Sequence, residues 1–389
     1  MFLGILIPFL IIILSSYVIW KSTDSFEAAA DYLGRNMSKG VKGATINAVA
    51  SSMPEFLTTI FFLFYVKNEG EFADSFSGGL GVTAGSAVFN ILVIPFAILF
   101  YGTLRLRAWN FPVNRKIIGR DGVFLILANI VLILIIWSKT LTAFHGLLLV
   151  LLYLVYIISL RKGFGKKPAE EDQENFQIPF ERLTIGHFLK LDLKQIILNG
   201  RRMNTTIAWI ALFLSTLVMS VGTWLLVEGT EMLGHDEYSF WGLEPLRGLG
   251  IPIIFLSVIF AAAATSIPDT MISLRDARKG NHIDSISNAL GSNIFDISFA
   301  LGLPLLIFTL ISGPIEMSFD VRKWSLSVWL VLFIINLVVL PLFVHSNTLG
   351  RRKGLILLGI YILFIVFIVE ENTASSLVSQ FVERFMISP

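Results

Sequence analysis

Long apolar segments separated by short polar ones make up almost the whole chain. Ten of these segments are long enough, or nearly so, to cross the apolar core of a bilayer, for which a helix needs about 20 residues. Several exceed that length, which indicates tilt or a break within the helix. The segments are residues 2–20, 40–66, 80–101, 123–138, 141–160, 205–228, 249–274, 283–311, 324–345 and 354–370. The pattern therefore predicts an all-α membrane protein with ten transmembrane helices.

Two motifs occur once in each half of the chain. SSMPEFLTTI (51–60) resembles TSIPDTMISL (265–274), because in both two hydroxyl residues precede an apolar residue, a proline and an acid. AGSAVFNILVIP (84–95) resembles LGSNIFDISFAL (290–301), with Gly-Ser, Phe and an amide or acid at matched offsets. Five spans separate corresponding helices, so the two halves are predicted to be inverted. Inverted repeats with interrupted helices are typical of secondary transporters whose site lies near the midplane.

The longest polar segment divides the ten spans into five and five. It reads GKKPAEEDQENFQ and has the mixed charge of a flexible linker. The C-terminal residues show a short amphipathic pattern that favours the membrane surface. We therefore expect a first five-helix repeat over 1–160, a linker loop over 161–204, a second, inverted repeat over 205–371 and an amphipathic tail over 372–389.

Composition supports the membrane interpretation. Of the 389 residues 55% are hydrophobic and the mean hydropathy is +0.76, values that exclude an ordinary soluble globular protein. The sequence has no cysteine, which excludes disulfides, thiol chemistry and cysteine-ligated metals. The net charge of +2 gives no indication of nucleic-acid binding, and none is expected.

The basic residues are distributed very unevenly among the loops. Of the 30 Lys and Arg residues, 24 lie in alternate loops, namely 21–42, 104–120, 161–202, 275–279 and 351–353. Loops rich in Lys and Arg face the cytoplasm. We therefore expect an integral protein of the plasma (inner) membrane with a cytoplasmic linker loop and both termini outside.

The repeated motifs concentrate oxygen atoms inside apolar spans. Each proline removes a backbone hydrogen bond and frees a carbonyl oxygen in the turn before it. The Gly-Ser motif adds a hydroxyl and, four residues later on the same helix face, an amide or a carboxylate. Its glycines, Gly85 and Gly291, permit close helix approach. The candidate ligands are the side chains of Glu55, Asn90, Asp269, Asp296, Ser51, Ser52, Ser86, Thr265, Ser266 and Ser292.

Charge counting indicates what these oxygens hold. Glu55, Asp269 and Asp296 lie in the middle of spans, and the sequence places no Lys, Arg or His in the middle of any span. An unpaired charge there costs roughly 2.5–3.5 kcal/mol on insertion scales. The acids therefore hold either cations or protons. Oxygen ligands without nitrogen or sulfur favour Ca²⁺ or Na⁺, whereas Mg²⁺ retains its waters and demands a tight octahedron.

At these motifs the sequence resembles the Ca²⁺/cation antiporter superfamily. Residues 51–55 with 85–90 look like its first alpha repeat, and 265–269 with 291–296 like its second. The segments SIPDT, ARKG and GSNIFDI are similar to the potassium-dependent branch of the sodium/calcium exchangers. The chain departs from the family in having Ala50 and Ala264 where glycine is usual. The linker is also too short for a regulatory β-sandwich domain of about 100 residues.

The resemblance implies a division of roles among the candidate ligands. Glu55 and Asp269 would be the central Ca²⁺ and Na⁺ ligands, and the other side chains would complete the sites. Backbone carbonyls near Ala48 and Ala262 would contribute as well. An Asp at the position of Asp296 is associated with K⁺ co-transport in the potassium-dependent branch, which makes K⁺ a further candidate ion.

The function that follows is exchange of Ca²⁺ for Na⁺ by alternating access, without enzyme activity or a cofactor. Three alternatives differ in class. A Ca²⁺/H⁺ antiporter would neutralise the same acids with protons, although the hydroxyl-rich lining favours Na⁺. A cation channel fits poorly with ligands buried at the centre of one chain. A membrane enzyme lacks a mid-membrane histidine. Expected partners are the transported ions Ca²⁺ and Na⁺, with K⁺ or H⁺ as further ions, and membrane lipids; no protein partner is predicted.

The charge distribution makes a testable prediction about sidedness. Because the sequence has no cysteine, single cysteines can be introduced at Asp172 in the linker and at Glu316 in the loop at 313–322. A membrane-impermeant maleimide should label position 316 and spare position 172 in intact cells, and should label both after permeabilisation. Labelling of position 172 in intact cells would refute the orientation.

Overall fold

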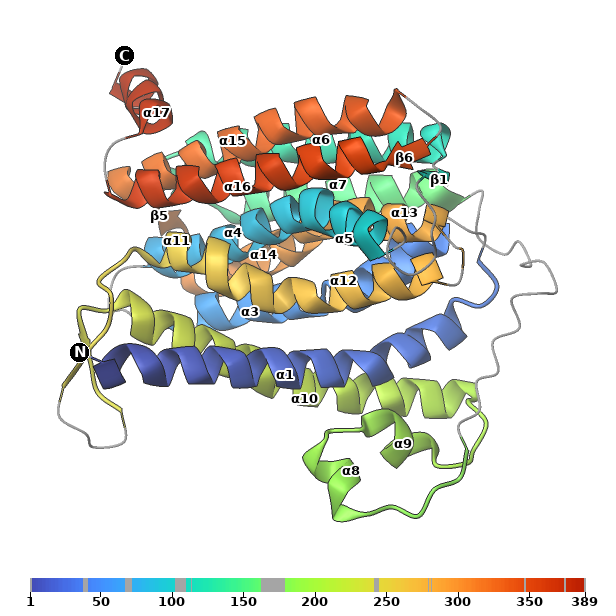
Figure 1. The fold of residues 1–389 in the computed structure, drawn as a ribbon. Coiled ribbons are helices and arrows are strands. Elements are labelled where there is room, and N and C mark those ends of the chain that lie inside the picture. The colour runs from blue at the N-terminus through green and yellow to red at the C-terminus, as the bar shows by residue number, and fades with distance from the viewer. Residues whose placement is uncertain are drawn as a thin grey trace.

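Long helices lying roughly along one direction make up almost the entire fold (Figure 1). The computed structural model describes residues 2–37, 41–66, 72–101, 110–112, 114–161, 179–240, 245–278, 280, 282–345, 348–373 and 376–387. Within these ranges nine helices are long and apolar enough to cross a membrane, or ten if the bent pair at 44–51 and 53–64 counts as one span. The predicted all-helical membrane fold is confirmed.

The first half contains two continuous and two interrupted spans after the N-terminal helix. Its elements are α1 (Phe2–Leu33), the π-helical turn η1 (Gly43–Asn47), α2 (Ala48–Ser51), α3 (Met53–Phe64), α4 (Phe72–Val88), the π-helical turn η2 (Phe89–Val93), α5 (Ile94–Tyr101), α6 (Arg115–Trp137) and α7 (Ala143–Leu160). Two short helices, α8 (Ile185–Leu189) and α9 (Leu193–Leu198), follow in the linker and lie beside one end of α10 (Figure 1).

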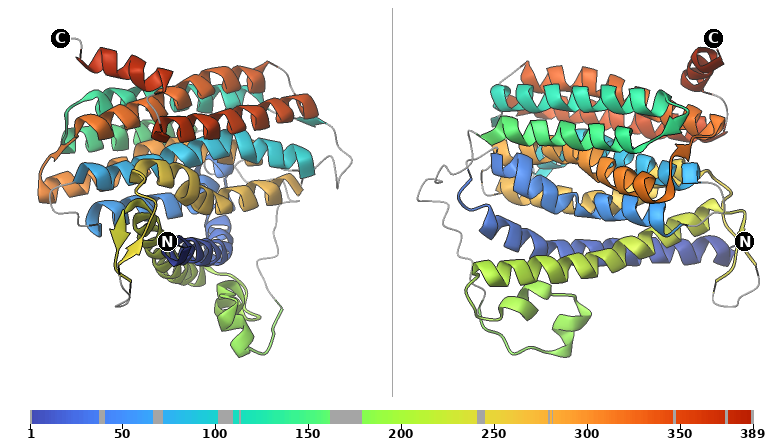
Figure 2. Two further views of the ribbon diagram at one scale, coloured as in Figure 1. Left: turned by 60° about the vertical axis from the view of Figure 1, so that its left-hand side comes forward. Right: turned by 180° about the vertical axis from the view of Figure 1, so that it is seen from behind.

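The elements of the second half correspond to those of the first, except that no break follows its first π-helical turn. They are α10 (Thr205–Gly234), α11 (Ile253–Leu256), η6 (Ser257–Ala261), α12 (Ala262–Arg278), α13 (His282–Phe295), η7 (Asp296–Ala300), α14 (Gly302–Ser312), α15 (Phe319–Val344) and α16 (Arg351–Thr373). A final amphipathic helix, α17 (Leu377–Ile387), packs against α15 at one end of the bundle (Figures 1 and 2).

Short antiparallel strand pairs join the loops at each end of the bundle. At one end β1 (Asn110–Pro112) pairs with β6 (Thr348–Gly350). At the other, β2 (Thr140–Leu141) pairs with β5 (Ile315–Glu316), and β3 (Glu237–Tyr238) with β4 (Leu246–Arg247). Each pair joins loops that the charge distribution assigns to the same side of the membrane.

The helix interruptions occur at corresponding places in the two halves. The turns η1 and η6 end four residues before the first hydroxyl residues of the hydroxyl-Pro-acid motifs, Ser51 and Thr265, and η2 and η7 both contain the amide or acid that ends the Gly-Ser motif. A π-helical turn inserts an extra residue into a helix and is frequent at functional sites. The spans with the candidate ligands are therefore those with irregular backbone. Within the first such span the helices on either side of Ser52 meet at 47°.

Helix α1 is longer than hydropathy predicts. The sequence pattern assigns residues 21–42 to a loop, but α1 continues to Leu33 and its charged last turns pack against α12. Arg275 of α12 is paired with Glu27 and, at 3.0 Å, with Asp24. The prediction was wrong because hydropathy does not detect the ion pairs between helices that hold these charged turns in place. Helices α1 and α10 lie side by side as a layer on one face of the other spans (Figures 1 and 2).

Close crossings between the halves are set by the two matched glycines. A Cβ added to Gly85 would lie 2.2 Å from the carbonyl oxygen of Val258, and one added to Gly291 would lie 2.7 Å from the Cα of Ala44. Ala44 and Val258 occupy corresponding positions in η1 and η6. Each Gly-Ser helix therefore crosses the interrupted span of the other half, which is the arrangement expected of interlocked inverted repeats.

The close crossings predict that a Gly→Ala substitution lowers stability at the crossings but not at an open position. Gly85→Ala and Gly291→Ala should each lower thermal stability in detergent by about 1–3 kcal/mol, because the added methyl group meets backbone that cannot rotate away. Gly359→Ala on α16 is the control, since no atom lies within 4 Å of its added Cβ. Equal melting temperatures for Gly85→Ala and Gly359→Ala would contradict the crossing geometry.

Candidate cation site

The repeated motifs of both halves meet in the interior of the bundle. Glu55 lies at the start of α3, Asp269 in α12, Asn90 in η2 and Asp296 at the start of η7. The side chains of these four residues are completely buried, and so are the six hydroxyl side chains proposed with them: Ser51, Ser52, Ser86, Thr265, Ser266 and Ser292.

Asp269 is held by side chains from both halves. Asn90 Nδ2 donates to Asp269 Oδ2 at 3.0 Å, and Ser292 Oγ donates to Asp269 Oδ1 at 2.7 Å. Ser292 Oγ lies 3.2 Å from Ser51 Oγ, which links the hydroxyl turn of the first half to the Gly-Ser helix of the second. The carboxylate therefore connects three elements of the site.

Among the described residues, only one carboxylate oxygen of Glu55 has a hydrogen-bond partner. Ser86 Oγ donates to its Oε1 at 3.0 Å, and Ser266 Oγ in turn donates to Ser86 Oγ at 3.1 Å. This again joins the Gly-Ser helix of one half to the hydroxyl turn of the other. The second carboxylate oxygen, Oε2, is buried and has no hydrogen-bond partner in the described part of the chain.

Several more buried oxygens in the site are without partners. Both carboxylate oxygens of Asp296, the Oδ1 of Asn90 and the Oγ of Ser52 lie outside hydrogen-bond geometry of every group that the structure describes, although Ser52 is near enough to Asp296 to interact with its carboxylate. Glu55 and Asp269 lie near enough to Asp296 for their charges to interact with it. Unpartnered buried polar atoms are rare in native proteins, and a bound ion or water is one of the few explanations for them.

The acids do not form a metal centre by themselves. Across the described ranges no group of three or more His, Asp or Glu side chains is close enough to hold one metal ion. An ion in this region would therefore need amide, hydroxyl or carbonyl oxygens in addition to carboxylates. The carbonyl of Ala48 accepts the amide of Ser52 at 3.0 Å, and that of Ala262 accepts Thr265 Oγ1 at 3.3 Å, so the role of both carbonyls as ligands stays a prediction.

Two asparagines of α13 belong to the network and were not among the predicted residues. Asn293 Oδ1 accepts a hydrogen bond from Asn90 Nδ2 at 3.1 Å, while Asn293 Nδ2 donates to the carbonyl of Ala87 at 2.9 Å. Asn288 contacts Ser51 at 3.5 Å and donates to Ser273 Oγ at 3.2 Å. Comparison of the repeats missed them because the first half has Ala87 where the second has Asn293. The sequence did contain one indication of them, since an asparagine in the middle of an apolar span is itself a candidate polar contact.

The contacts of Asn293 decide which way the Asn90 amide points. The carbonyl of Ala87 can only accept, so Asn293 must present its oxygen to Asn90. Asn90 then directs its NH₂ group towards Asn293 and Asp269, which leaves its own Oδ1 unpartnered. The network thus leaves the side-chain oxygen of Asn90, which is a suitable cation ligand, facing away from Asn293 and Asp269.

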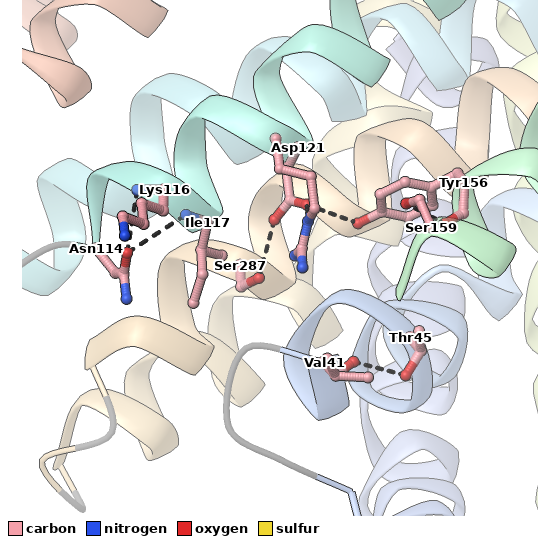
Figure 3. Close-up of polar contacts among 10 residues, drawn as sticks. Val41, Thr45, Asn114, Lys116, Ile117, Asp121, Tyr156, Ser159 and Ser287 are labelled. Carbon is pink, nitrogen blue, oxygen red and sulfur yellow. Dashed lines mark hydrogen bonds and ion pairs between the residues drawn. The ribbon is translucent and has the colours of Figure 1, made fainter. Parts of the chain in front are cut away.

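A separate buried acid is fully paired. Asp121 of α6 accepts hydrogen bonds from Tyr156 of α7 at 3.2 Å and from Ser287 of α13 at 3.1 Å (Figure 3). Arg120 Nε lies 2.7 Å from the same carboxylate. Asp121 therefore ties α6 and α7 to the helix that carries Asn288, Ser292 and Asn293. Since its charge is already compensated, it is not a candidate ion ligand.

Comparisons with known proteins indicate the family to which the chain is similar. The sequence model of the family described as "Sodium/calcium exchanger protein" matches residues 7–161 and 207–370. Mouse sodium/potassium/calcium exchanger 4 is 33% identical over 154 residues, which are 39% of this chain and 23% of that protein. Human sodium/potassium/calcium exchanger 3 is 36% identical over 120 residues, or 30% of this chain and 19% of that protein. The matched part thus spans less than a quarter of these curated relatives.

Two solved structures share the fold at low sequence identity. The H⁺/Ca²⁺ exchanger CAX superposes with a TM-score of 0.64 and 16% identity over 99% of this chain and 85% of that chain. The sodium-calcium exchanger NCX_Mj, soaked with Na⁺ and Sr²⁺, superposes with a TM-score of 0.56 and 20% identity over 94% of this chain and 99% of that chain.

Proposed function

The chain belongs to the sodium/calcium exchanger family, and we propose that it is a secondary-active antiporter that exchanges Ca²⁺ for Na⁺. The observation that carries this proposal is the set of buried oxygens on Glu55, Asn90 and Asp296 that have no hydrogen-bond partner in the described part of the chain. Carboxylates buried in a bilayer without a basic partner require cations or protons. Because the surrounding groups offer oxygen alone, hard cations of the Ca²⁺ and Na⁺ kind fit them.

Competition for the same carboxylates would couple the two ions. An occupied site has less net charge than an empty one, so the protein can more easily adopt the intermediate conformation in which the site is closed off from water. Both inverted halves contribute residues to the proposed site, which supports alternating access as the mechanism. An empty site would retain unpaired charge, which opposes the transition and suppresses leak.

Proton coupling is the closest alternative. A H⁺/Ca²⁺ exchanger has the same fold, and protons would neutralise the acids without further ligands. The extra oxygens favour Na⁺, since Ser52 and Asn90 add unpartnered atoms that a proton on a carboxylate does not need. We further propose the plasma (inner) membrane as the location, with both termini outside and the linker in the cytoplasm.

Loss of either central acid is predicted to weaken Ca²⁺ transport strongly. Glu55→Gln and Asp269→Asn each remove one negative ligand, and hydrogen bonds or contacts to charged groups contribute about 1.5–3 kcal/mol. Apparent Ca²⁺ affinity should fall roughly 10–100-fold, measured as Ca²⁺-dependent ²²Na⁺ flux in proteoliposomes. Glu316→Gln in the exposed strand β5 is the matched control and should transport normally. Wild-type flux in Glu55→Gln would exclude Glu55 as a central ligand.

The residue Asp296 is predicted to confer potassium dependence. With Glu55 and Asp269 it makes three negative charges, of which one Ca²⁺ neutralises two. A monovalent cation would balance the third, and both oxygens of Asp296 lack partners within the described chain. K⁺ should therefore stimulate Na⁺-driven ⁴⁵Ca²⁺ flux at fixed ionic strength, and Asp296→Asn should transport at a rate independent of K⁺. Equal wild-type rates in K⁺ and choline would leave a simple sodium/calcium exchanger.

A further inference from the structure

An apolar groove lies between α6 and α15, which run side by side in the part of the bundle farthest from α1 and α10 (Figures 1 and 2). Its volume is about 530 Å³, within the range of roughly 300–1,000 Å³ typical of small-molecule sites. On the α6 side two glycines, Gly119 and Gly122, line the groove and have no side chains to fill it. We call this feature the α6–α15 groove.

The groove is accessible from the surrounding membrane. Three apolar side chains on its walls, Val123, Leu127 and Leu337, are 43–59% exposed. Because α6 and α15 are both long and apolar enough to span a membrane, side chains exposed on them face lipid hydrocarbon. A ligand that is dissolved in the membrane can therefore reach the groove without passing through water.

The walls of the groove offer no charge to a ligand. None of the described residues that line it is acidic or basic, and Asn336 is the one polar side chain among them. An ionised group placed there would lose its water without gaining a counter-charge. The lining therefore favours a neutral ligand over one that buries a phosphate, a carboxylate or an ammonium group.

The amide of Asn336 provides a polar anchor on this apolar wall. Its side chain is completely buried, and neither Nδ2 nor Oδ1 has a hydrogen-bond partner in the described part of the chain. Such atoms are rare in native proteins, and each one calls for a partner. The amide offers a donor and an acceptor side by side, so a ligand that satisfies it must both accept and donate. A bare hydrocarbon chain does neither.

A proline adds an acceptor close to this amide. Pro341 lies inside α15 and has no amide hydrogen, so the carbonyl of Leu337, four residues earlier, loses its usual helical donor. Leu337 and Pro341 both line the groove with Asn336. An ester or a ketone cannot donate and would leave these acceptor oxygens unpaired. A hydroxyl group donates one hydrogen bond and accepts others, which fits the combination.

We propose that the α6–α15 groove binds a neutral, membrane-dissolved amphiphile through a single hydroxyl group. The hydroxyl group hydrogen-bonds to the amide of Asn336, and the hydrocarbon body lies along Gly122 and Gly119. From Asn336 to Val344, the last residue of α15 that lines the groove, is eight residues or roughly 12 Å of helix. The chemical class is therefore that of long-chain alcohols and other monohydroxylated lipids.

Two photoreactive probes of equal length test the chemistry of the ligand. One is a dodecanol with a diazirine in its chain, and the other has a methyl group in place of the hydroxyl. The full chain is placed in nanodiscs of phosphatidylcholine, whose headgroup carries no hydroxyl. The alcohol should label peptides of α6 and α15 about fivefold more than the methyl probe, a ratio equal to about 1 kcal/mol. Equal labelling by the two probes would overturn the proposal.

Substitution of two buried asparagines tests the anchor. Asn336→Leu should abolish the preference for the alcohol over the methyl probe. Asn129→Leu is the matched control, because Asn129 of α6 is also completely buried with no partner for its Oδ1 among the described residues, but it does not line the groove. This control should retain the wild-type preference. A preference that persists in Asn336→Leu, or disappears in both variants, would overturn the assignment.

Filling the groove tests the position of the site. Nothing lies within 4 Å of a Cβ added to Gly119, so Gly119→Leu can place its side chain in the groove without a clash with the fold. It should lower labelling by both probes about fivefold, whereas Gly359→Leu on α16, which is equally open, should label like the wild type. Full labelling of Gly119→Leu would overturn the proposal. Melting temperatures check folding, and no readout depends on ion exchange.

Discussion

A carboxylate inside a bilayer needs a partner that compensates its charge, and this requirement explains much of the protein's structure. Free energies of several kcal/mol oppose an isolated charge in hydrocarbon. Three arrangements meet the constraint here. Asp121 is compensated by an arginine and two hydroxyl groups, and Glu27 by an arginine on a neighbouring helix. Glu55 and Asp296 instead retain oxygens that have no partner among the described residues, and this is why we propose that mobile ions bind there.

The inverted repeat supplies the oxygens that such a site needs. Each interrupted span crosses the Gly-Ser helix of the opposite half, and the crossings are close because Gly85 and Gly291 have no side chain. As a result, hydroxyl turns of one half hydrogen-bond to Gly-Ser helices of the other, as Ser266 does with Ser86 and Ser51 with Ser292. Irregular backbone is stable at this depth because protein surrounds it on all sides.

Much of this arrangement could be predicted from the sequence, since the repeated motifs and the apolar segments are strong local signals. The spans, their inversion and the burial of all ten candidate side chains follow from them. Other features depend on contacts between distant segments. The extension of α1 to Leu33 rests on Arg275, 248 residues from its partner Glu27. Asn293 was not predicted because its counterpart in the first repeat, Ala87, carries no polar side chain.

The central claim is that the unpartnered oxygens bind Ca²⁺ and Na⁺ alternately, and opposing gradients test it most directly. Purified protein in proteoliposomes would be loaded with Na⁺ and diluted into Na⁺-free ⁴⁵Ca²⁺ medium, in parallel with vesicles that carry only an outward proton gradient. The account predicts saturable Ca²⁺ uptake driven by Na⁺ and little uptake driven by protons. Ca²⁺ uptake that is driven by the proton gradient and is independent of Na⁺ would contradict this account.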